Sequence, residues 1–286
     1  MDLRLFPSEV MIDLTYRILL DRGVDEAGLR TYLAKTMSGS FDRQEVVQWV
    51  LGSSEFETHR HFRGRSSLTP SINASRCRFV RTLPRARQIV DLGGLSLSDE
   101  RGALVAAGYP YEFDRLVVVD LPSEERHELY RLDEGPSVVE THLGPVTYRY
   151  SSMTDLSGIA DGSIDLVYSG QSIEHVTRAD AEIVLGEARR VLRPGGHLAV
   201  DTPNRRITRL YSEEFTDPDH KHEYTWAELR ELVERHGFSV VESKGLNYAG
   251  RSAASRTFDI DEVAGNCGIY SEVDDCYVLA VTARRE

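Results

Sequence analysis

The stretch IVDLGGLSLSDERGAL, residues 89–104, is the part of the chain that decides its fold. It opens with a short apolar run, continues with an acid and the pair Gly93-Gly94, and ends in a helix-like segment. This order is typical of a strand-to-helix turn at a ligand site, where glycine lets the backbone approach a ligand closely. A dinucleotide turn uses the spacing Gly-x-Gly-x-x-Gly to expose amide groups to a pyrophosphate. Leu95 and Leu97 follow here instead of further glycines, which disfavours a NAD or FAD site.

Apolar runs and amphipathic helical patterns alternate from about residue 72 onward. Short buried runs separated by helices indicate a mostly parallel sheet. Five runs are of this kind: RQIVDLGG, RLVVVDLP, PVTYRYSS, SIDLVYSG and GGHLAVDT. Two more, GFSVVESKGL and CYVLAVTAR, have no obvious helix between them and predict a closing hairpin. We therefore predict a doubly wound α/β fold with a seven-stranded sheet.

Residues 1–60 show helical patterns and no strand pattern. We expect short helices that start at Ser8, Asp25 and Asp42, each a residue type that caps helix N-termini. The chain is thus divided into a helical N-terminal domain at 1–60, a linker at 61–72 and an α/β domain at 73–286.

The net charge of -12 repels polyanions, so nucleic acid is not expected as a partner. The basic stretch HRHFRGRSS, residues 59–67, is interpreted as a solvated linker; the alternative is a site for an anionic partner. Three scattered cysteines suggest neither a disulfide framework nor a zinc site, and no apolar run approaches the ~20 residues that span a bilayer. The first residues lack the features of a signal peptide. Cytoplasm is therefore the expected compartment, with no membrane span.

Polar residues follow the predicted strands, at the edge where a doubly wound sheet binds its ligands. The first strand leads to Asp91, Gly93 and Gly94. The second ends at Asp120, an acid placed to accept two ribose hydroxyls, with Leu121 next to it for an adenine face. S-adenosylmethionine carries no phosphate, so it tolerates a loop with fewer glycines than a dinucleotide needs. After the third strand, a polar loop with Ser152 and Met153 can contact the adenine edge.

The fourth and fifth strands deliver the residues expected to act on a substrate. Ser169, Gln171, Glu174 and His175 follow the fourth strand. Histidine titrates near neutral pH, so His175 can take the proton of an acceptor hydroxyl, with Glu174 orienting it or binding a cation. Asn204 follows the fifth strand on the substrate side.

Together these segments resemble the class I S-adenosylmethionine-dependent methyltransferases, in particular a branch of sugar and small-molecule O-methyltransferases. The resemblance covers roughly residues 75–285 and rests on VDLGG, VVVDLP, DGSIDLVYSGQSIEHV, RRVLRPGGHLAVDTPN and HEYTWAELRELVERHGF. It implies a Rossmann-like methyltransferase fold. It also implies that Asp91, Gly93 and Gly94 line the methionine end of the donor, that Asp120 holds the ribose, and that Leu121 and Met153 flank the adenine. By the same resemblance Ser169 lies near the sulfonium and His175 is the base; Ser152 and Gln171 complete the predicted donor site.

The first fifth of the chain resembles a family of small helical domains found in surface-glycan and linker proteins. The matching features are YRILLDRGVD at 16–25, Gly28-Leu29 and SSEF at 53–56. The resemblance implies a docking or scaffolding role, either toward a protein partner or between two copies of the chain. The alternative is a packing appendage to the next domain.

The segment Asp217–Tyr224 contains two alternating histidines, His220 and His222, next to acidic residues. With Asp219 and Glu223 they can form a divalent metal site if they point to one side of an extended segment. The spacing matches no strong metal signature, so no metal is predicted, and His222 and Glu223 are assigned to substrate contacts. Thr225 and Glu228 then predict a capping box for the following helix.

We therefore predict methyl transfer to a hydroxyl of a sugar or glycan intermediate, with His175 as general base. Two alternatives remain: a phenolic or amine metabolite as acceptor, and a non-catalytic scaffold protein of methyltransferase fold whose cleft is filled by Leu95 or Leu97. The irregular stretch 245–275 is interpreted as a lid or an acceptor wall.

Overall fold

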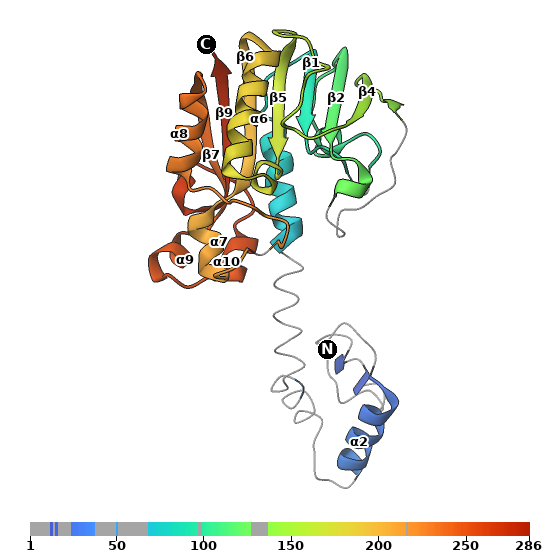
Figure 1. Cartoon of the computed structure of the whole chain (residues 1–286). Helices are drawn as coiled ribbons and strands as arrows, with labels where there is room; N and C mark the ends of the chain where they lie inside the picture. Colours follow the sequence, from blue (N-terminus) through green and yellow to red (C-terminus); the bar gives the residue numbers. More distant parts are fainter. Residues whose placement is uncertain are drawn as a thin grey trace. The chain divides into compact units, whose positions relative to one another are not determined.

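The computed structural model describes residues 12–13, 15–16, 24–37, 50, 68–96, 99–126, 137–215 and 217–286. The chain divides into two compact units, Met1–Ser67 and Leu68–Glu286 (Figure 1). The second unit begins inside the range 61–72 that the sequence assigned to a linker, because residues 68–80 are already helical.

The described part of the first unit contains helix α2, Glu26–Met37. The Asp25 carboxylate accepts a hydrogen bond of 2.7 Å from the Gly28 amide, so Asp25 caps this helix as its residue type predicts. Tyr32 is buried, and its ring meets that of Tyr16 edge to face at 6.0 Å. The predicted helix starts Ser8 and Asp42 lie outside the described residues.

The second unit is built on a nine-stranded sheet with the order β3-β4-β2-β1-β5-β6-β9-β7-β8. All seven predicted strands are present. Five are mutually parallel: β1 (Gln88–Leu92), β2 (Arg115–Asp120), β4 (Pro145–Tyr150), β5 (Ile164–Gly170) and β6 (Leu192–Pro203). Two are antiparallel: β7 (Phe238–Tyr248) and β9 (Cys276–Arg285). The predicted count of seven was too low because two short edge strands, β3 (Val138–Glu140) and β8 (Ile269–Tyr270), extend the sheet.

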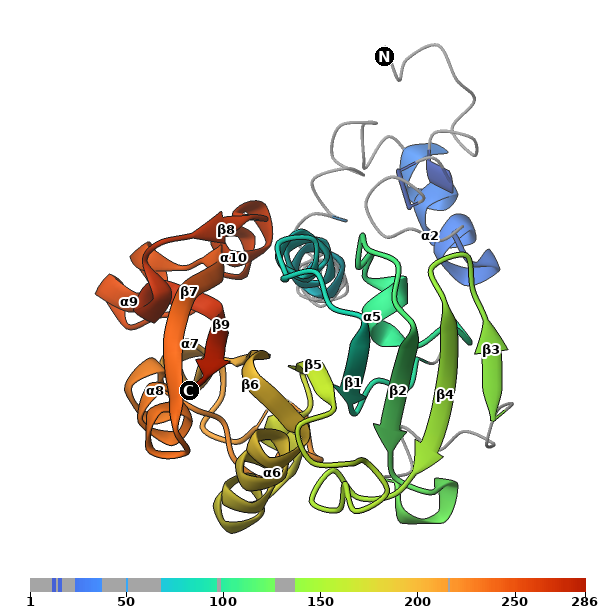
Figure 2. The same ribbon diagram turned by 90° about the horizontal axis from the view of Figure 1, so that it is seen from above.

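Both faces of the sheet are covered by helices (Figure 2). One face packs on α6 (Arg178–Val191) and α8 (Trp226–Arg235), and the other on the helix at 68–80, α5 (Ala103–Ala106) and α7 (Arg205–Tyr211). Each face has its own hydrophobic core: the first core lies under α6 and α8, and the second core lies under the other three helices. Neighbouring strand residues point to opposite faces, so Val90 belongs to the first core and Ile89 to the second. The strands are therefore apolar on both sides, which explains their continuous apolar runs.

β7 and β9 pair antiparallel, which confirms the predicted closing pair. The connection between them was expected to contain no helix, and that expectation was wrong. This stretch forms α9 (Gly250–Ser255), α10 (Ile260–Gly265), β8 and a short turn, Val273–Asp275. It also packs against the helix at 68–80: Ser71 donates a hydrogen bond of 2.7 Å to the Ala264 carbonyl, and Ser75 accepts one of 2.9 Å from the Gly268 amide. The stretch is therefore held against both the sheet and that helix. In the described part of the chain, no helix combines the length and the apolarity that crossing a bilayer requires.

The capping box predicted at the start of α8 is confirmed. Thr225 Oγ1 accepts a hydrogen bond from the Glu228 amide, and Glu228 Oε2 accepts one of 2.9 Å from the Thr225 amide. Because the cap satisfies amides that have no partner within the helix, we expect Thr225→Ala to lower the free energy of unfolding by about 1 kcal/mol. Urea unfolding at constant m-value measures the loss. Thr225→Ser, which keeps the hydroxyl, is the matched control; equal losses in both variants would contradict the cap.

Candidate functional site

The carboxyl ends of the five parallel strands meet at one edge of the sheet. Leu92 at the end of β1 lies beside Val119 of β2 and Ser169 of β5, and Gly170 lies beside Asp201 of β6. This register gathers the predicted residues of the first, second and fourth strands into one region, as expected for a ligand site in a doubly wound sheet.

The glycine turn after β1 is tightly packed against its surroundings. Gly93 has a φ of 68°, and a Cβ atom there would lie 2.5 Å from the Cβ of Ser172. A Cβ at Gly94 would lie 2.2 Å from Oδ2 of Asp91. Both positions therefore require glycine, one for its backbone angle and both for space.

Asp91 is buried beneath this turn and accepts a hydrogen bond of 3.1 Å from the Leu104 amide at the start of α5. Burial raises the pKa of Asp91 to about 7, and the nearby carboxylate of Asp120 adds to this effect. The Asp91 side chain thus links the turn to the helix that follows it.

Asp120 ends β2 and holds the outer part of the loop. Its carboxylate accepts hydrogen bonds from the amides of Leu95 at 3.1 Å and Leu121 at 2.8 Å, and Nε of Arg126 lies 3.4 Å away. Burial raises the pKa of Asp120. The side chain of Leu95 packs against the second core, so this leucine turns its backbone amide toward Asp120 and its side chain away. Leu97 lies outside the described residues.

The remaining predicted donor residues lie at the same edge in different roles. Ser152 hydrogen-bonds Thr154, and Met153 is half-buried against the first core. Ser169 is buried, and its hydroxyl pairs at 2.6 Å with that of Ser172. Gln171 has a φ of 54° and donates a hydrogen bond of 3.0 Å from Nε2 to Asp201. Their contacts with a donor stay predictions.

A buried charged cluster that sequence reasoning missed surrounds Asp201 of β6. Arg76, from the helix at 68–80, contacts Asp201 through Nε at 2.6 Å, and the hydroxyl of Tyr168 donates to the same carboxylate at 2.5 Å. Burial opposes the charged form of Arg76, but the Asp201 carboxylate outweighs it and raises the pKa of Arg76. Arg76 and Asp201 are 125 residues apart, so no local pattern could have paired them.

The residues predicted for acid–base chemistry, Glu174 and His175, lie in the turn Ile173–His175 that follows β5. His175 Nδ1 is 2.9 Å from Oδ2 of Asp219, and its ring meets the ring of His220 edge to face at 4.9 Å. Glu174 is fully buried; its Oε2 accepts a hydrogen bond of 2.9 Å from Thr202, and burial raises its pKa. The structure thus places Asp219 and His220 in contact with His175, next to Glu174.

Two of the residues assigned to substrate instead make contacts within the protein. Asn204 is buried, caps α7 through its side-chain oxygen and donates to the carbonyls of Asp274 and Cys276. Glu223 is also buried, with Oε1 2.8 Å from Nδ1 of His220 and Oε2 bonded to Thr208. A direct substrate contact stays a prediction for both.

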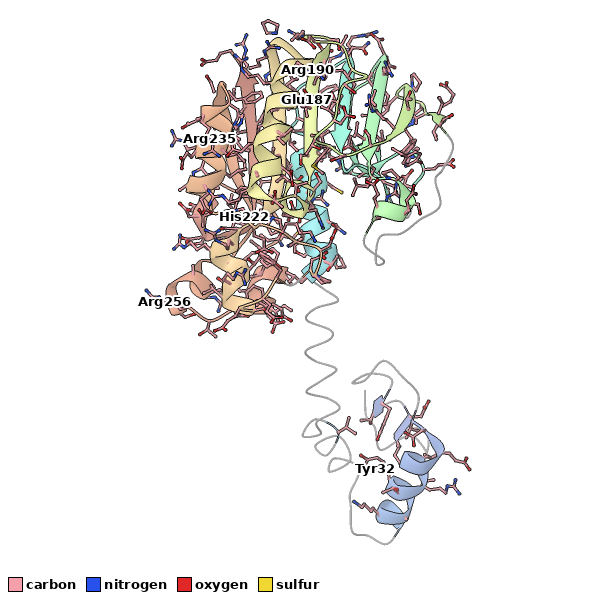
Figure 3. The ribbon with its side chains drawn as sticks, viewed as in Figure 1. Tyr32, Glu187, Arg190, His222, Arg235 and Arg256 are labelled. Carbon is pink, nitrogen blue, oxygen red and sulfur yellow. The ribbon has the colours of Figure 1, made fainter. Side chains whose placement is uncertain are left out.

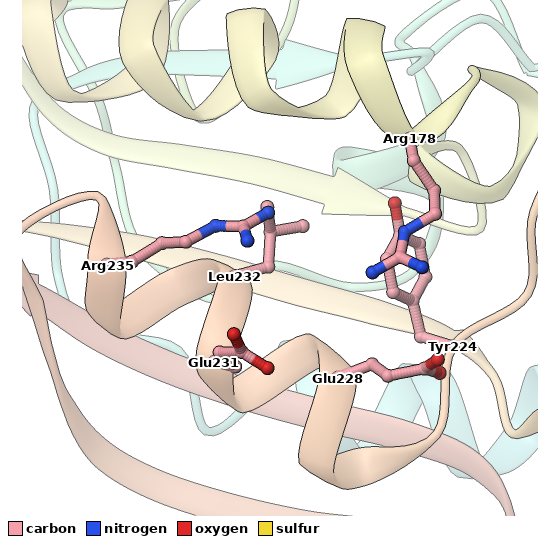
Figure 4. A pocket seen from close by; sticks show the side chains of 6 residues that line it. All are labelled: Arg178, Tyr224, Glu228, Glu231, Leu232 and Arg235. Atoms are coloured by element: carbon pink, nitrogen blue, oxygen red, sulfur yellow. The ribbon is translucent and has the colours of Figure 1, made fainter.

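His222 and its neighbour His220 do not share partners. His222 is one of the side chains labelled in Figure 3. Its ring packs edge to face on Tyr224 at 4.6 Å, and burial lowers the pKa of His222. Beside it lies a small pocket between α6 and α8, lined by Arg178, Tyr224, Glu228, Glu231, Leu232 and Arg235 (Figure 4). Its volume of about 10 Å³ holds at most one water molecule, so this pocket takes no substrate.

The buried Asp91 predicts a specific pH dependence of stability. Its folded pKa of about 7 exceeds the ordinary value of about 4, so the folded state keeps a proton that the unfolded chain releases between these values. The contribution of Asp91 to the free energy of unfolding should therefore fall as pH rises from 4 to 7, and Asp91→Asn, which cannot ionise, should lack this fall. Urea unfolding of both proteins across this range measures the difference; parallel curves would contradict the shift.

Comparison with known proteins agrees with this geometry. Residues 102–200 match the family described as "Methyltransferase domain", and residues 7–60 match "Domain of unknown function (DUF4214)". A protein of Mycolicibacterium smegmatis described as "Probable S-adenosylmethionine-dependent methyltransferase" is 38% identical over 101 residues, which are 35% of this chain and 38% of that protein. An "Uncharacterized 37.1 kDa protein in transposon TN4556" of Streptomyces fradiae is 30% identical over 136 residues, 44% of this chain and 36% of that protein. The chain thus spans less than two fifths of the length of either relative.

Among solved structures, a "SAM-dependent methyltransferase, possible histamine N-methyltransferase" of Thermotoga maritima superposes with a TM-score of 0.52 at 19% identity. The superposition covers 80% of this chain and 96% of that one, and at this identity it supports the fold alone. The sheet order, the glycine turn and the family match agree with one another. The second unit of the chain therefore has the Rossmann-like fold of class I S-adenosylmethionine-dependent methyltransferases, and residues 102–200 within it match a methyltransferase domain family.

Proposed function

We propose that the chain is an O-methyltransferase that methylates a hydroxyl group of a sugar or glycan intermediate. The observation that carries the proposal is the contact of 2.9 Å between His175 Nδ1 and Asp219 at the strand edge that also bears the glycine turn. A donor site and an acid–base pair at one sheet edge are the parts that methyl transfer to oxygen needs.

The residues around the glycine turn fit the methyl donor. Asp120 would accept the ribose hydroxyls, with Leu121 and Met153 beside the adenine, and Asp91 with the two glycines would hold the methionine end. Loss of two hydrogen bonds to a charged carboxylate costs about 3 kcal/mol or more, so Asp120 carries much of the donor affinity. When bound, S-adenosylmethionine supplies an electrophilic methyl group on a positive sulfonium.

His175 acts as the general base of this site when the protein's side chains alone carry out the reaction. Asp219 engages Nδ1, which turns Nε2 toward the acceptor and fixes the tautomer. An acceptor hydroxyl at Nε2 gives up its proton as its oxygen attacks the methyl carbon. The hydrogen bond from Thr202 to Glu174 attaches the turn that carries His175 to β6.

The neighbours of His175 favour a polyhydroxylated acceptor. Asp219 and His220 contact His175 directly, and further polar side chains are linked to them or to its turn: Glu174, Thr202 and Glu223. A phenol would be favoured by an aromatic lining; here Phe215 lies 6.1 Å from the His220 ring, centroid to centroid. The scaffold alternative needs Leu95 or Leu97 in the cleft; Leu95 packs on the core instead, and Leu97 lies outside the described residues.

The other expectations for the chain stay part of the proposal. The net charge of -12 argues against nucleic acid as the acceptor, and we place the protein in the cytoplasm. The N-terminal unit would contact a protein partner or a second copy of the chain, as its resemblance to helical domains of surface-glycan and linker proteins implies.

Titration with S-adenosylhomocysteine tests the donor site. We expect micromolar binding by calorimetry, weakened about 100-fold in Asp120→Ala and less in Asp120→Asn, which still accepts the Leu95 amide. Asp161→Ala removes an exposed carboxylate at the opposite end of the sheet and serves as control. Absence of binding by the folded chain would favour the scaffold alternative.

His175→Ala tests the base. We expect binding of S-adenosylhomocysteine within threefold of the unmodified chain, but a loss of turnover of about 10²- to 10⁴-fold. Transfer of labelled methyl to a panel of free and nucleotide-linked sugars measures turnover. Near-normal turnover in the variant would show that His175 is not needed, and transfer to phenols instead of sugars would replace the acceptor class.

A further inference from the structure

Three potential metal ligands converge after β5. Glu174 and His175 come from the turn at Ile173–His175, and His220 comes from the segment between α7 and α8. One ligand atom from each lies within 4.8 Å of the other two. We call this the Glu174–His175–His220 cluster.

Glu174 brings a buried carboxylate oxygen to the cluster. Its side chain is 0% exposed, and Thr202 donates a hydrogen bond to Oε2. Oε1 has no hydrogen-bond partner among the residues that the structure describes. A buried oxygen of this kind is costly unless a donor or a cation completes its coordination.

Carboxylates outside the cluster hold both histidine rings. Nδ1 of His175 is 2.9 Å from Asp219, and Nδ1 of His220 is 2.8 Å from Glu223. In metal sites the ring nitrogen that does not bind the ion commonly contacts such a carboxylate, which fixes the ring and makes the ligating nitrogen more basic. Nε2 is thus the nitrogen that each ring would offer to an ion.

The backbone keeps the two parts of the cluster together. The amides of Lys221 and His222 donate hydrogen bonds of 2.8 and 3.1 Å to the carbonyl of Glu174. The segment that carries His220 and both supporting carboxylates is therefore anchored on the residue that supplies the buried oxygen.

We propose that the Glu174–His175–His220 cluster binds one divalent first-row transition ion. Two imidazoles and one carboxylate suit such ions, and three protein ligands leave positions for an acceptor oxygen. This ligand set differs from the one that the sequence suggested: Asp219 and Glu223 orient the rings, and His222 packs on Tyr224.

The role of the ion in catalysis rests on the proposed function, whereas its binding does not. A hydroxyl beside a divalent ion loses its proton more easily. With the ion bound, Nε2 of His175 is a ligand, so the ion replaces His175 in activating the hydroxyl, and the proton leaves to water; methyl transfer to the acceptor oxygen is the part of the proposed function that is kept. The acceptor oxygen forms a bond to the methyl carbon while the carbon–sulfur bond breaks and its electron pair returns to sulfur. The products are the methyl ether, the neutral thioether and one proton.

Metal titration of the full chain tests the proposal. After dialysis against a chelator, Zn²⁺ and Mn²⁺ are titrated by calorimetry, and Co²⁺ is followed by its visible absorption. We expect one ion per chain with at least one of these metals, about 100-fold weaker binding in Glu174→Gln and His220→Asn, and 10- to 100-fold weaker binding in Asp219→Asn. His142→Asn, an exposed histidine between β3 and β4, is the matched control and should bind as the unmodified chain does.

The outcomes separate the ion site from the proposed function. Circular dichroism and titration with S-adenosylhomocysteine confirm that each variant is folded with its donor site intact. No ion binding by a chain that binds S-adenosylhomocysteine would overturn the ion site and leave methyl transfer standing. Unchanged affinity in both Glu174→Gln and His220→Asn would also overturn it. Ion binding without methyl transfer to any sugar would instead count against the proposed function alone.

Discussion

The parallel register of the sheet brings three buried or largely buried carboxylates, Asp91, Asp120 and Asp201, to one edge. Burial is the main reason that the pKa of Asp91 is raised; Asp120 and Asp201 add to the shift, and Arg76 opposes it. Backbone amides from Leu95 and Leu104 and the guanidinium of Arg76 supply the compensation. These contacts constrain the glycine turn, because the turn must place the Leu95 amide against Asp120 and lead into the helix whose Leu104 amide contacts Asp91.

The seven main strands and the cap at Thr225 could be predicted because each depends on residues close in sequence. Apolar runs mark the strands, and Thr225 and Glu228 are three positions apart. The edge strands β3 and β8 have only three and two residues, and each pairs with a longer strand of the sheet. Segments this short carry almost no periodic signal in the sequence. The helices α9 and α10 have six residues each, too few for an amphipathic pattern to be recognised.

The candidate site was predictable in part for the same reason. Strand ends identify Asp91, Asp120 and His175 because polar residues follow apolar runs there. Their partners could not be identified, since Asp219 lies 44 residues after His175 and Arg76 lies 125 residues before Asp201. Pattern reasoning also weighed Leu95 as a missing glycine. In the structure the Leu95 amide donates to Asp120, and the core accommodates the Leu95 side chain.

The order of residues 217–224 follows from the two tasks of that segment. The amides of Lys221 and His222 donate hydrogen bonds to the Glu174 carbonyl. These bonds fix the backbone of the segment, and the backbone sets the directions of the side chains next to them. Asp219 then reaches His175, and Glu223 reaches back to His220 within the segment. Each of the two rings therefore has a carboxylate from this segment at its Nδ1. The segment contributes Asp219, His220 and Glu223 to the contacts around His175, and the turn after β5 contributes Glu174 and His175.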